Sequence, residues 1–214
     1  FPKSGFDTID HVSQTINDYN PDFIFWSALS SHIHGEGEYV NIQYGYNLLD
    51  SIETTAKKVA GGLQVTGELQ NIYNHFNNVD YFIGGESEIV LPELIDKVIK
   101  GNSIKNVKGV IYRNSKDEVI MNVRQPIIND LDIIPPYDYS VFDDQVFYRP
   151  YNGKVVRAVD YELSRGCIYA CEYCVETVIQ SYYGFDDVAP GSGTILNPKK
   201  YLRHKSAERI FFEI

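Results

Sequence analysis

Residues 79–101 read VDYFIGGESEIVLPELIDKVIKG, and this stretch decides the fold. Its first five residues are mostly apolar and run into two glycines, which is typical of a buried strand that ends in a turn. Residues 89–100 repeat apolar side chains at helical spacing, and Gly101 closes the predicted amphipathic helix. A strand, a glycine loop and a helix in this order form the repeating unit of a parallel α/β sheet.

The same unit occurs twice more towards the N-terminus. Predicted strands and helices alternate there, at residues 23–26, 44–55, 57–60 and 69–76. We therefore expect an α/β fold built on a Rossmann-like parallel sheet. Ligands bind such sheets in the loops that follow the carboxyl ends of the strands. Three predicted loops have that position, at residues 30–37, 61–67 and 84–88.

The pattern changes after Gly101. Two apolar runs, at residues 107–112 and 118–123, predict a hairpin, and a segment rich in proline and tyrosine follows it as an ordered linker. The chain opens on Phe1 and closes on the apolar residues 209–213, which we predict as a strand, so we expect it to be part of a longer protein. The predicted units are a Rossmann-like domain with its hairpin, a linker and a second domain, at residues 1–125, 126–154 and 155–214.

Composition excludes several classes of protein. The 214 residues include 19 Lys and Arg against 29 Asp and Glu, a formal net charge of −10, which argues against a nucleic-acid-binding surface. No apolar run approaches the roughly 20 residues that a membrane-spanning helix needs. The sequence contains neither a nucleophile elbow nor a Walker-type phosphate loop.

All three cysteines lie within eight residues, at Cys167, Cys171 and Cys174. A clustered, odd number of cysteines is a poor disulfide framework and a good metal or cluster motif, and it indicates a reducing compartment such as the cytoplasm. Three thiolates on one loop can hold three irons of a [4Fe–4S] cluster and leave the fourth iron open. A zinc site and a chance grouping of buried thiols remain as alternatives.

The residues around these cysteines carry a resemblance. Ser-Arg-Gly precedes Cys167, and Tyr173 stands just before the last cysteine, so the motif resembles that of the radical S-adenosylmethionine superfamily. Upstream, the paired glycines, the DYFIGGESE junction and the VKGVIYR segment resemble the branch in which a cobalamin-binding domain precedes the radical barrel. The resemblance covers most of residues 20–174.

This resemblance implies an activity and its cofactors. It implies that residues 155–214 start a (β/α) barrel in which a [4Fe–4S] cluster reductively cleaves S-adenosyl-L-methionine to a 5′-deoxyadenosyl radical. Tyr173 would lie near the adenine, and Glu213 would begin the segment that holds the amino group. A flavodoxin- or ferredoxin-type donor would supply the electron, and the substrate is a small molecule or is unknown. The chain by itself is not expected to turn over.

Cobalamin, with assisted methyl transfer or related radical chemistry, is a further implication of this branch. Ser30 and His32 lie in a Ser-x-His-x-x-Gly segment that resembles the cobalt-ligating motif but lacks its aspartate. His32 is therefore a candidate cobalt ligand, a lining residue or a plain surface histidine. Gly61 and Gly62 either admit a nucleotide tail or form a tight turn.

Two further expectations complete the sequence analysis. Glu86 and Glu88 are expected to cap the helix that follows them, with a hydrogen bond from a ribose or an amide to Glu86 as the alternative. The competing functions are a radical enzyme that has lost cobalamin and a non-catalytic iron–sulfur or zinc protein.

Overall fold

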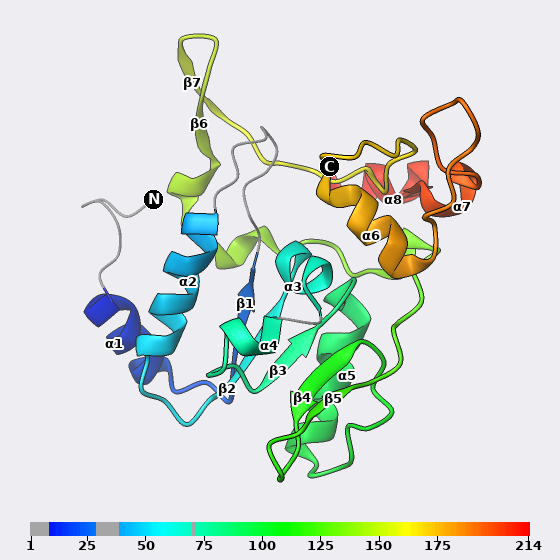
Figure 1. The fold of residues 1–214 in the computed structure, drawn as a ribbon. Coiled ribbons are helices and arrows are strands. Elements are labelled where there is room, and N and C mark those ends of the chain that lie inside the picture. The colour runs from blue at the N-terminus through cyan, green and yellow to red at the C-terminus, as the bar shows by residue number, and fades with distance from the viewer. Residues whose placement is uncertain (1–8, 29–38, 70–71) are drawn as a thin grey trace.

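A five-stranded sheet is the centre of the computed structural model, which describes residues 9–28, 39–69 and 72–214 (Figure 1). Strands follow one another in the order β1-β2-β3-β4-β5. The first three run parallel and the last two form an antiparallel hairpin. Their bounds are β1 (Phe23–Ser27), β2 (Lys57–Gly61), β3 (Tyr81–Ile83), β4 (Val110–Arg113) and β5 (Val119–Met121). The prediction of an α/β fold with a Rossmann-like parallel sheet is confirmed.

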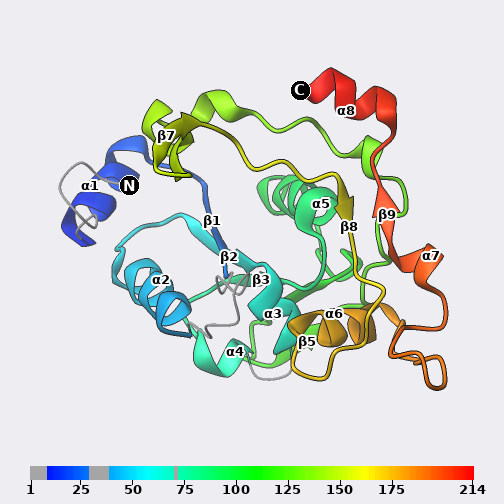
Figure 2. The same cartoon turned by 90° about the horizontal axis from the view of Figure 1, so that it is seen from above.

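Helices cover both faces of this sheet, as Figure 2 shows. On one face Ala60 and Phe82 pack with side chains of α2 (Tyr39–Ser51), α3 (Leu63–Gly67) and α4 (Ile72–His75). On the other face Val59 and Ile83 pack against α5 (Ser87–Ile99). Neighbouring residues of one strand thus enter opposite cores, because successive side chains of a strand point to opposite faces. This double coverage explains the continuous apolar runs in the sequence.

Two predicted helices differ from the observed ones. Helix α2 starts and ends earlier than predicted, because Ile42, Tyr46 and Leu49 form its buried face. The helix predicted at residues 69–76 is shorter in the structure, as α4 (Ile72–His75), and residues 70–71 lie outside the described part. The short helix α3 before it was not predicted.

The predicted linker wraps the surface in short turns. Three 3-10 helices, η2 (Leu131–Ile133), η3 (Tyr139–Val141) and η4 (Asp144–Phe147), each begin after an aspartate whose side chain accepts a backbone N–H. The hairpin β6 (Tyr148–Tyr151) and β7 (Lys154–Arg157) then projects from the body (Figure 1). At the other end of the chain, helix α1 (Ile9–Tyr19) precedes β1. Within residues 9–28, 39–69 and 72–214, every helix is too short or too polar to cross a bilayer.

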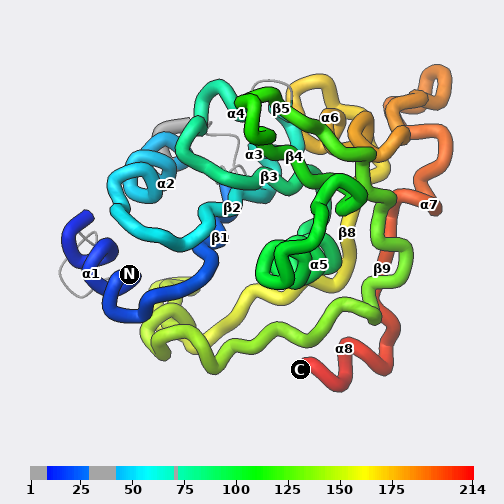
Figure 3. Tube along the Cα trace, turned by 90° about the horizontal axis from the view of Figure 1, so that it is seen from below, coloured from blue at the N-terminus to red at the C-terminus, as the bar shows by residue number. Residues whose placement is uncertain are grey.

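The segment that carries the cysteines lies beside the α/β sheet. Its short strands β8 (Ser164–Arg165) and β9 (Arg203–His204) pair antiparallel, and Figures 2 and 3 show them side by side at one flank of α5. Helix α6 (Val175–Tyr183) packs against α3, and the short helix α7 (Pro198–Tyr201) leads into β9.

The strand predicted at residues 209–213 is wrong, because these residues belong to helix α8 (Ala207–Glu213). The Ser206 hydroxyl accepts the Arg209 N–H at 3.0 Å and caps this helix. A strand needs a neighbouring strand for its backbone hydrogen bonds, and none lies beside these residues in the described chain. A helix satisfies the same groups internally.

Candidate functional site

A pocket of about 550 Å³ lies where the carboxyl edge of the parallel strands faces the cysteine-bearing segment. This volume is within the range of roughly 300–1,000 Å³ that is typical of small-molecule sites. Residues from both sides line it, among them Ser27, Gly62, Thr66, Glu86, Glu88, Glu162, Arg165, Gly166, Glu176, Tyr183, Tyr201 and Arg203. Residues of the second and third predicted loops line this pocket. Ser30 and His32, in the first, lie outside the described residues.

Gly62 has a positive φ of 96°, which glycine adopts far more readily than other residues. A Cβ there would meet the Ala28 carbonyl oxygen at 3.0 Å, so the turn itself requires glycine. Gly61 is the buried last residue of β2. The tight-turn interpretation of this pair therefore holds for Gly62, which also lines the pocket.

Thr66 joins two of the loops at this edge. Its hydroxyl accepts the Gly85 N–H at 2.8 Å and donates to the Gly62 carbonyl at 3.0 Å. The hydroxyl thereby holds the loop after β2 and the loop after β3 in one arrangement.

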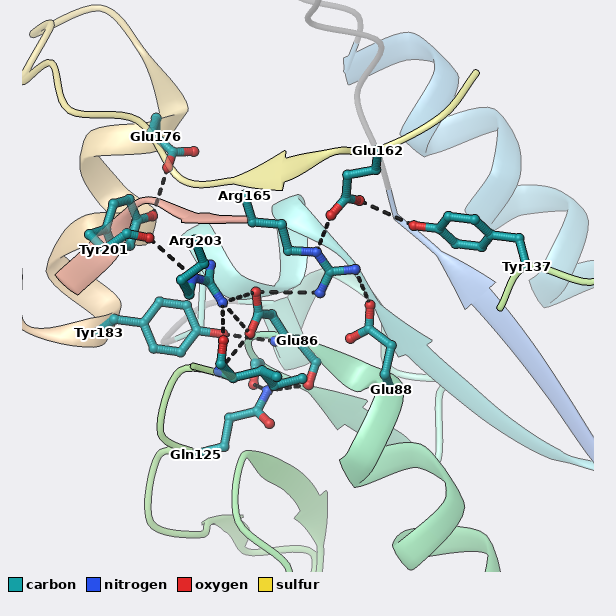
Figure 4. A network of polar contacts seen from close by, with 12 residues as sticks. Glu86, Glu88, Gln125, Tyr137, Glu162, Arg165, Glu176, Tyr183, Tyr201 and Arg203 are labelled. Carbon is teal, nitrogen blue, oxygen red and sulfur yellow. Dashed lines mark hydrogen bonds and ion pairs between the residues drawn. The ribbon is translucent and has the colours of Figure 1, made fainter. Parts of the chain in front are cut away.

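Glu86 connects the α/β sheet to the cysteine-bearing segment (Figure 4). Its carboxylate accepts from Arg203 Nη1 at 2.7 and 2.9 Å and from the Ile128 N–H at 2.9 Å. The Arg203 side chain is only 7% exposed, so its charge depends on this partner. As expected, Glu86 occupies the N-cap position of α5 and Glu88 lies in its first turn. The Glu86 side chain makes no capping hydrogen bond, however, because its carboxylate binds Arg203.

Arg165, from the Ser-Arg-Gly segment, lies beside this pair (Figure 4). Its guanidinium binds the carboxylates of Glu88 and Glu162, and it approaches Glu86 at 3.4 Å. Burial alone lowers the pKa of Arg165, but the hydrogen bonds and charges of Glu88 and Glu162 outweigh that effect and raise it. The guanidinium thus stays charged at every physiological pH.

Helix α6 starts at the cysteines and ends on the loop after β3. Tyr182 donates its hydroxyl to the Gly84 carbonyl at 2.8 Å, and the Tyr183 hydroxyl accepts the Glu86 N–H at 2.8 Å. Burial and the nearby Glu86 charge raise the pKa of Tyr183. Both tyrosines stay neutral hydrogen-bonding groups, and they tie the cysteine segment to the sheet.

The cysteine loop begins at a second glycine that cannot be replaced without strain. Gly166 has a φ of 93°, and a Cβ there would meet the Tyr201 carbonyl oxygen at 2.5 Å. The residues after it are anchored along their backbone, since the Ile168 carbonyl accepts the Ile195 N–H and Ala170 donates to Gly193. The loop is therefore held on both sides of its first cysteine.

Glu176 lies in the first turn of α6, directly after the cysteine loop, and its carboxylate accepts a hydrogen bond from the Tyr201 hydroxyl at 2.7 Å. Burial raises the pKa of Glu176, against the opposing effects of the Tyr201 hydroxyl, Arg203 and the Cys167 N–H. Burial and Glu176 in turn raise the pKa of Tyr201.

Cys167, Cys171 and Cys174 are free thiols and are partly exposed. Their chemistry fits a soft iron–sulfur centre, for which thiolates are the usual ligands. The thiols are not gathered in advance: no group of three or more His, Cys, Asp or Glu within the described residues could hold a metal ion. Because metal sites often assemble only when the metal binds, the donor set fits such a centre although its geometry is not preformed.

The other predicted site residues lie apart from one another. Tyr173 is 92% exposed at the tip of the cysteine loop. Glu213 lies on α8, where Lys205 binds its carboxylate at 2.6 Å and Arg209 also binds it. Burial opposes these bonds, which nevertheless lower the pKa of Glu213 to about 2.

Sequence reasoning missed Arg203 and the second role of Glu86. Nothing in the local sequence marks Arg203, because it stands in a basic stretch that is typical of a solvated surface. The sequence could have identified Arg165 as a site residue, since it belongs to the Ser-Arg-Gly segment that precedes Cys167.

The fold matches part of two solved radical S-adenosylmethionine enzymes, one described as cobalamin-dependent and one solved with cobalamin bound. The chain resembles the structure of apo OxsB, a cobalamin-dependent S-adenosylmethionine radical enzyme, with a TM-score of 0.58, 17% identity and coverage of 96% of this chain and 24% of OxsB. It also resembles TsrM, a radical S-adenosylmethionine methyltransferase from Kitasatospora setae solved with cobalamin and a [4Fe–4S] cluster bound. Here the TM-score is 0.55 and the identity 16%, with coverage of 95% of this chain and 37% of TsrM.

Two curated relatives are enzymes by name. The chain is 31% identical over 119 residues to an anaerobic magnesium-protoporphyrin IX monomethyl ester cyclase of Synechocystis, covering 54% of this chain and 22% of the cyclase. It is 25% identical over 169 residues to an uncharacterized methyltransferase of Pyrococcus horikoshii, covering 78% of this chain and 34% of that protein. The chain thus spans about a fifth to a third of these relatives, and no family model matches it. The resemblance to the cobalamin-binding branch of the radical S-adenosylmethionine superfamily is confirmed, and its relatives are enzymes.

Proposed function

We propose that this chain carries the cluster-binding segment of a radical S-adenosylmethionine enzyme, with Cys167, Cys171 and Cys174 as the three thiolate ligands of a [4Fe–4S] cluster. The observation that carries the proposal is three free thiols on one anchored loop, within a fold shared with radical enzymes. When bound, the cluster supplies the electron that cleaves S-adenosyl-L-methionine to methionine and a 5′-deoxyadenosyl radical.

The chain's own residues position this chemistry. Gly166 lets the loop pass against the Tyr201 backbone, and α6 begins directly after Cys174. Arg165, Glu86 and Arg203 fix the loop's flank against the sheet, so the pocket and the loop keep one relative placement. Tyr173 lies on the exposed side of the loop, where its backbone can meet the adenine, and Glu213 remains a proposed contact of the amino group.

The wider assignment follows from the relatives. We propose a small-molecule substrate, a flavodoxin- or ferredoxin-type electron donor and a cytoplasmic location, since free thiols suit a reducing compartment. Methyl transfer and ring closure are the candidate reactions, because the relatives are a methyltransferase and a cyclase by name.

Cobalamin binding in the pocket is a second proposal, and a specific observation favours it. Glu88 lines the pocket, and its Oε2 is buried without a hydrogen-bond partner in the described chain. A buried carboxylate oxygen without a partner is costly, and a ligand N–H would satisfy it. A corrinoid carries several amide side chains that supply such donors at its rim, so its chemistry fits this wall.

Anaerobic reconstitution with iron and sulfide tests the cluster. The wild-type protein is expected to bind about four irons, as a [4Fe–4S] centre requires, and to show broad visible absorbance. Alanine at any of the three cysteines is expected to abolish the stable cluster. Glu172→Ala, at an exposed position in the same loop, serves as the control and keeps the iron. Stoichiometric zinc without colour would favour the non-catalytic alternative.

Gel filtration after anaerobic incubation with hydroxocobalamin tests the second proposal. Corrin absorbance is expected to elute with the protein, and Glu88→Ala is expected to weaken binding about tenfold, the effect of losing one hydrogen bond to a charged group. Glu93→Ala is the control, because it removes a carboxylate from an exposed position of the same helix that is not part of the pocket lining. A protein that holds iron but no corrinoid would favour the radical enzyme without cobalamin.

A further inference from the structure

Gln180 of α6 reaches from the helix interior to the cysteine loop. Its side-chain nitrogen Nε2 donates to the Cys167 carbonyl at 2.9 Å and to the Tyr169 carbonyl at 3.1 Å. The residue is 1% exposed, so water cannot replace either bond. One amide group thus holds two carbonyls of the loop.

The same helix also holds the last cysteine. Cys174 is the residue that precedes α6, and its carbonyl accepts the hydroxyl of Thr177 at 2.8 Å and the Thr177 N–H at 3.2 Å. A helix is a rigid element, so Gln180 and Thr177 hold the first and third cysteines at one fixed separation.

The bond to Cys167 also orients a peptide group. A trans peptide places its carbonyl and its N–H on opposite sides. Holding the Cys167 carbonyl towards Gln180 therefore directs the Ile168 N–H to the side away from α6. Hydrogen bonds from peptide N–H groups near the sulfurs help to set the properties of iron–sulfur centres.

We propose that Gln180 is a positioning residue for the cluster ligands: it fixes Cys167 relative to Cys174 and sets the peptide orientation within the loop. The proposal rests on the proposed function, because it concerns ligands of the same cluster. Gln180 touches neither the cluster nor the substrate, and it acts only through the loop backbone.

The chain supplies a matched control. Gln125 is also buried, at 6% exposure, and its Nε2 donates to the Gly84 carbonyl at 2.9 Å and to the Glu86 carbonyl at 2.6 Å. Gln125→Met and Gln180→Met therefore remove the same chemical group and the same number of bonds. Only Gln180→Met removes these bonds at the cysteine loop.

The test reconstitutes the wild-type protein, Gln180→Met, Gln180→Glu and Gln125→Met anaerobically. The rate at which each releases iron to a chelator, the electron paramagnetic resonance signal of its reduced cluster and its thermal unfolding midpoint are then compared. Both Gln180 variants are expected to release iron at least tenfold faster and to show altered g-values. Gln125→Met is expected to lower the unfolding midpoint to a similar extent and to keep wild-type release and g-values.

The outcomes separate the two proposals. If the wild-type protein holds a cluster and both Gln180 variants keep its release rate and signal, the positioning role is overturned. The same conclusion follows if Gln125→Met accelerates release as much as Gln180→Met, because the effect would then be one of general stability. If the wild-type protein holds no iron, the proposed function fails, and the positioning role fails with it.

Discussion

Replacing Glu86 by glutamine tests how firmly the α/β sheet is joined to the cysteine-bearing segment. The change keeps the shape of the side chain and its acceptor for the Ile128 N–H, but it removes the charge that Arg203 faces at 2.7 and 2.9 Å. Breaking one side of a buried ion pair costs about 3–5 kcal/mol. Arg203 retains bonds to the carbonyls of Tyr201 and Ile128. We therefore expect a loss of about 2–3 kcal/mol in the free energy of unfolding, the value of one hydrogen bond to a charged group.

Urea unfolding followed by circular dichroism measures this loss. Asp96→Asn, in the helix that directly follows Glu86, is the control: its ion pair with Lys100 is exposed and is expected to contribute about 0.5 kcal/mol or less. The double variant with Arg203→Met should cost about 1–3 kcal/mol less than the sum of the two single changes. A Glu86→Gln protein as stable as the control, or strictly additive losses, would refute the role given to this pair.

Three further predictions concern other parts of the site. Gly166→Ala should destabilise the protein by about 1–3 kcal/mol more than Gly184→Ala, measured by urea unfolding, because both positions have positive φ but only Gly166 lacks space for a Cβ; equal losses would contradict this reasoning. Since the pKa of Glu213 is lowered to about 2, its stabilising contribution is present above pH 4.5 and is lost as the pH falls towards 2. The difference in thermal midpoint between the wild-type protein and Glu213→Gln should shrink over that interval, and a constant difference would refute the assignment. Tyr173→Phe should leave the reconstituted iron content unchanged, because the side chain is 92% exposed; loss of iron would assign the hydroxyl a role in binding.

The sheet could be predicted because a strand that is buried on both faces appears in the sequence as a continuous apolar run. Strand β2 is apolar throughout its last residues, with Val59 entering one core and Ala60 the other. Helix α5 was recognised from its apolar spacing and from Gly101, although it begins at Ser87. Local patterns of this kind need no knowledge of distant contacts.

The strand predicted at residues 209–213 shows where such patterns stop. The apolar run Ile210, Phe211 and Phe212 suits a strand or a helix. Capping by Ser206 favours the helix, and no strand of residues 9–28, 39–69 and 72–214 pairs with the run. Phe211 and Phe212 are 85% and 74% exposed, so burial by a partner did not determine the outcome.

The site likewise contains residues that the sequence predicts and residues that it does not. The three cysteines were identified because their spacing alone carries the chemistry. The pairing of Glu86 with Arg203 joins residues 117 positions apart, and Gln180 acts on backbone carbonyls that no sequence pattern marks. Both depend on how the two parts of the chain pack, which short-range periodicity does not record.

The most direct test of the account is whether the cluster offers an open iron to S-adenosyl-L-methionine. The reduced, reconstituted protein should give an electron paramagnetic resonance signal whose g-values shift when S-adenosyl-L-methionine is added, since the amino acid group would bind the iron that Cys167, Cys171 and Cys174 leave free. A cluster whose signal is the same with and without a saturating amount of S-adenosyl-L-methionine would contradict the account.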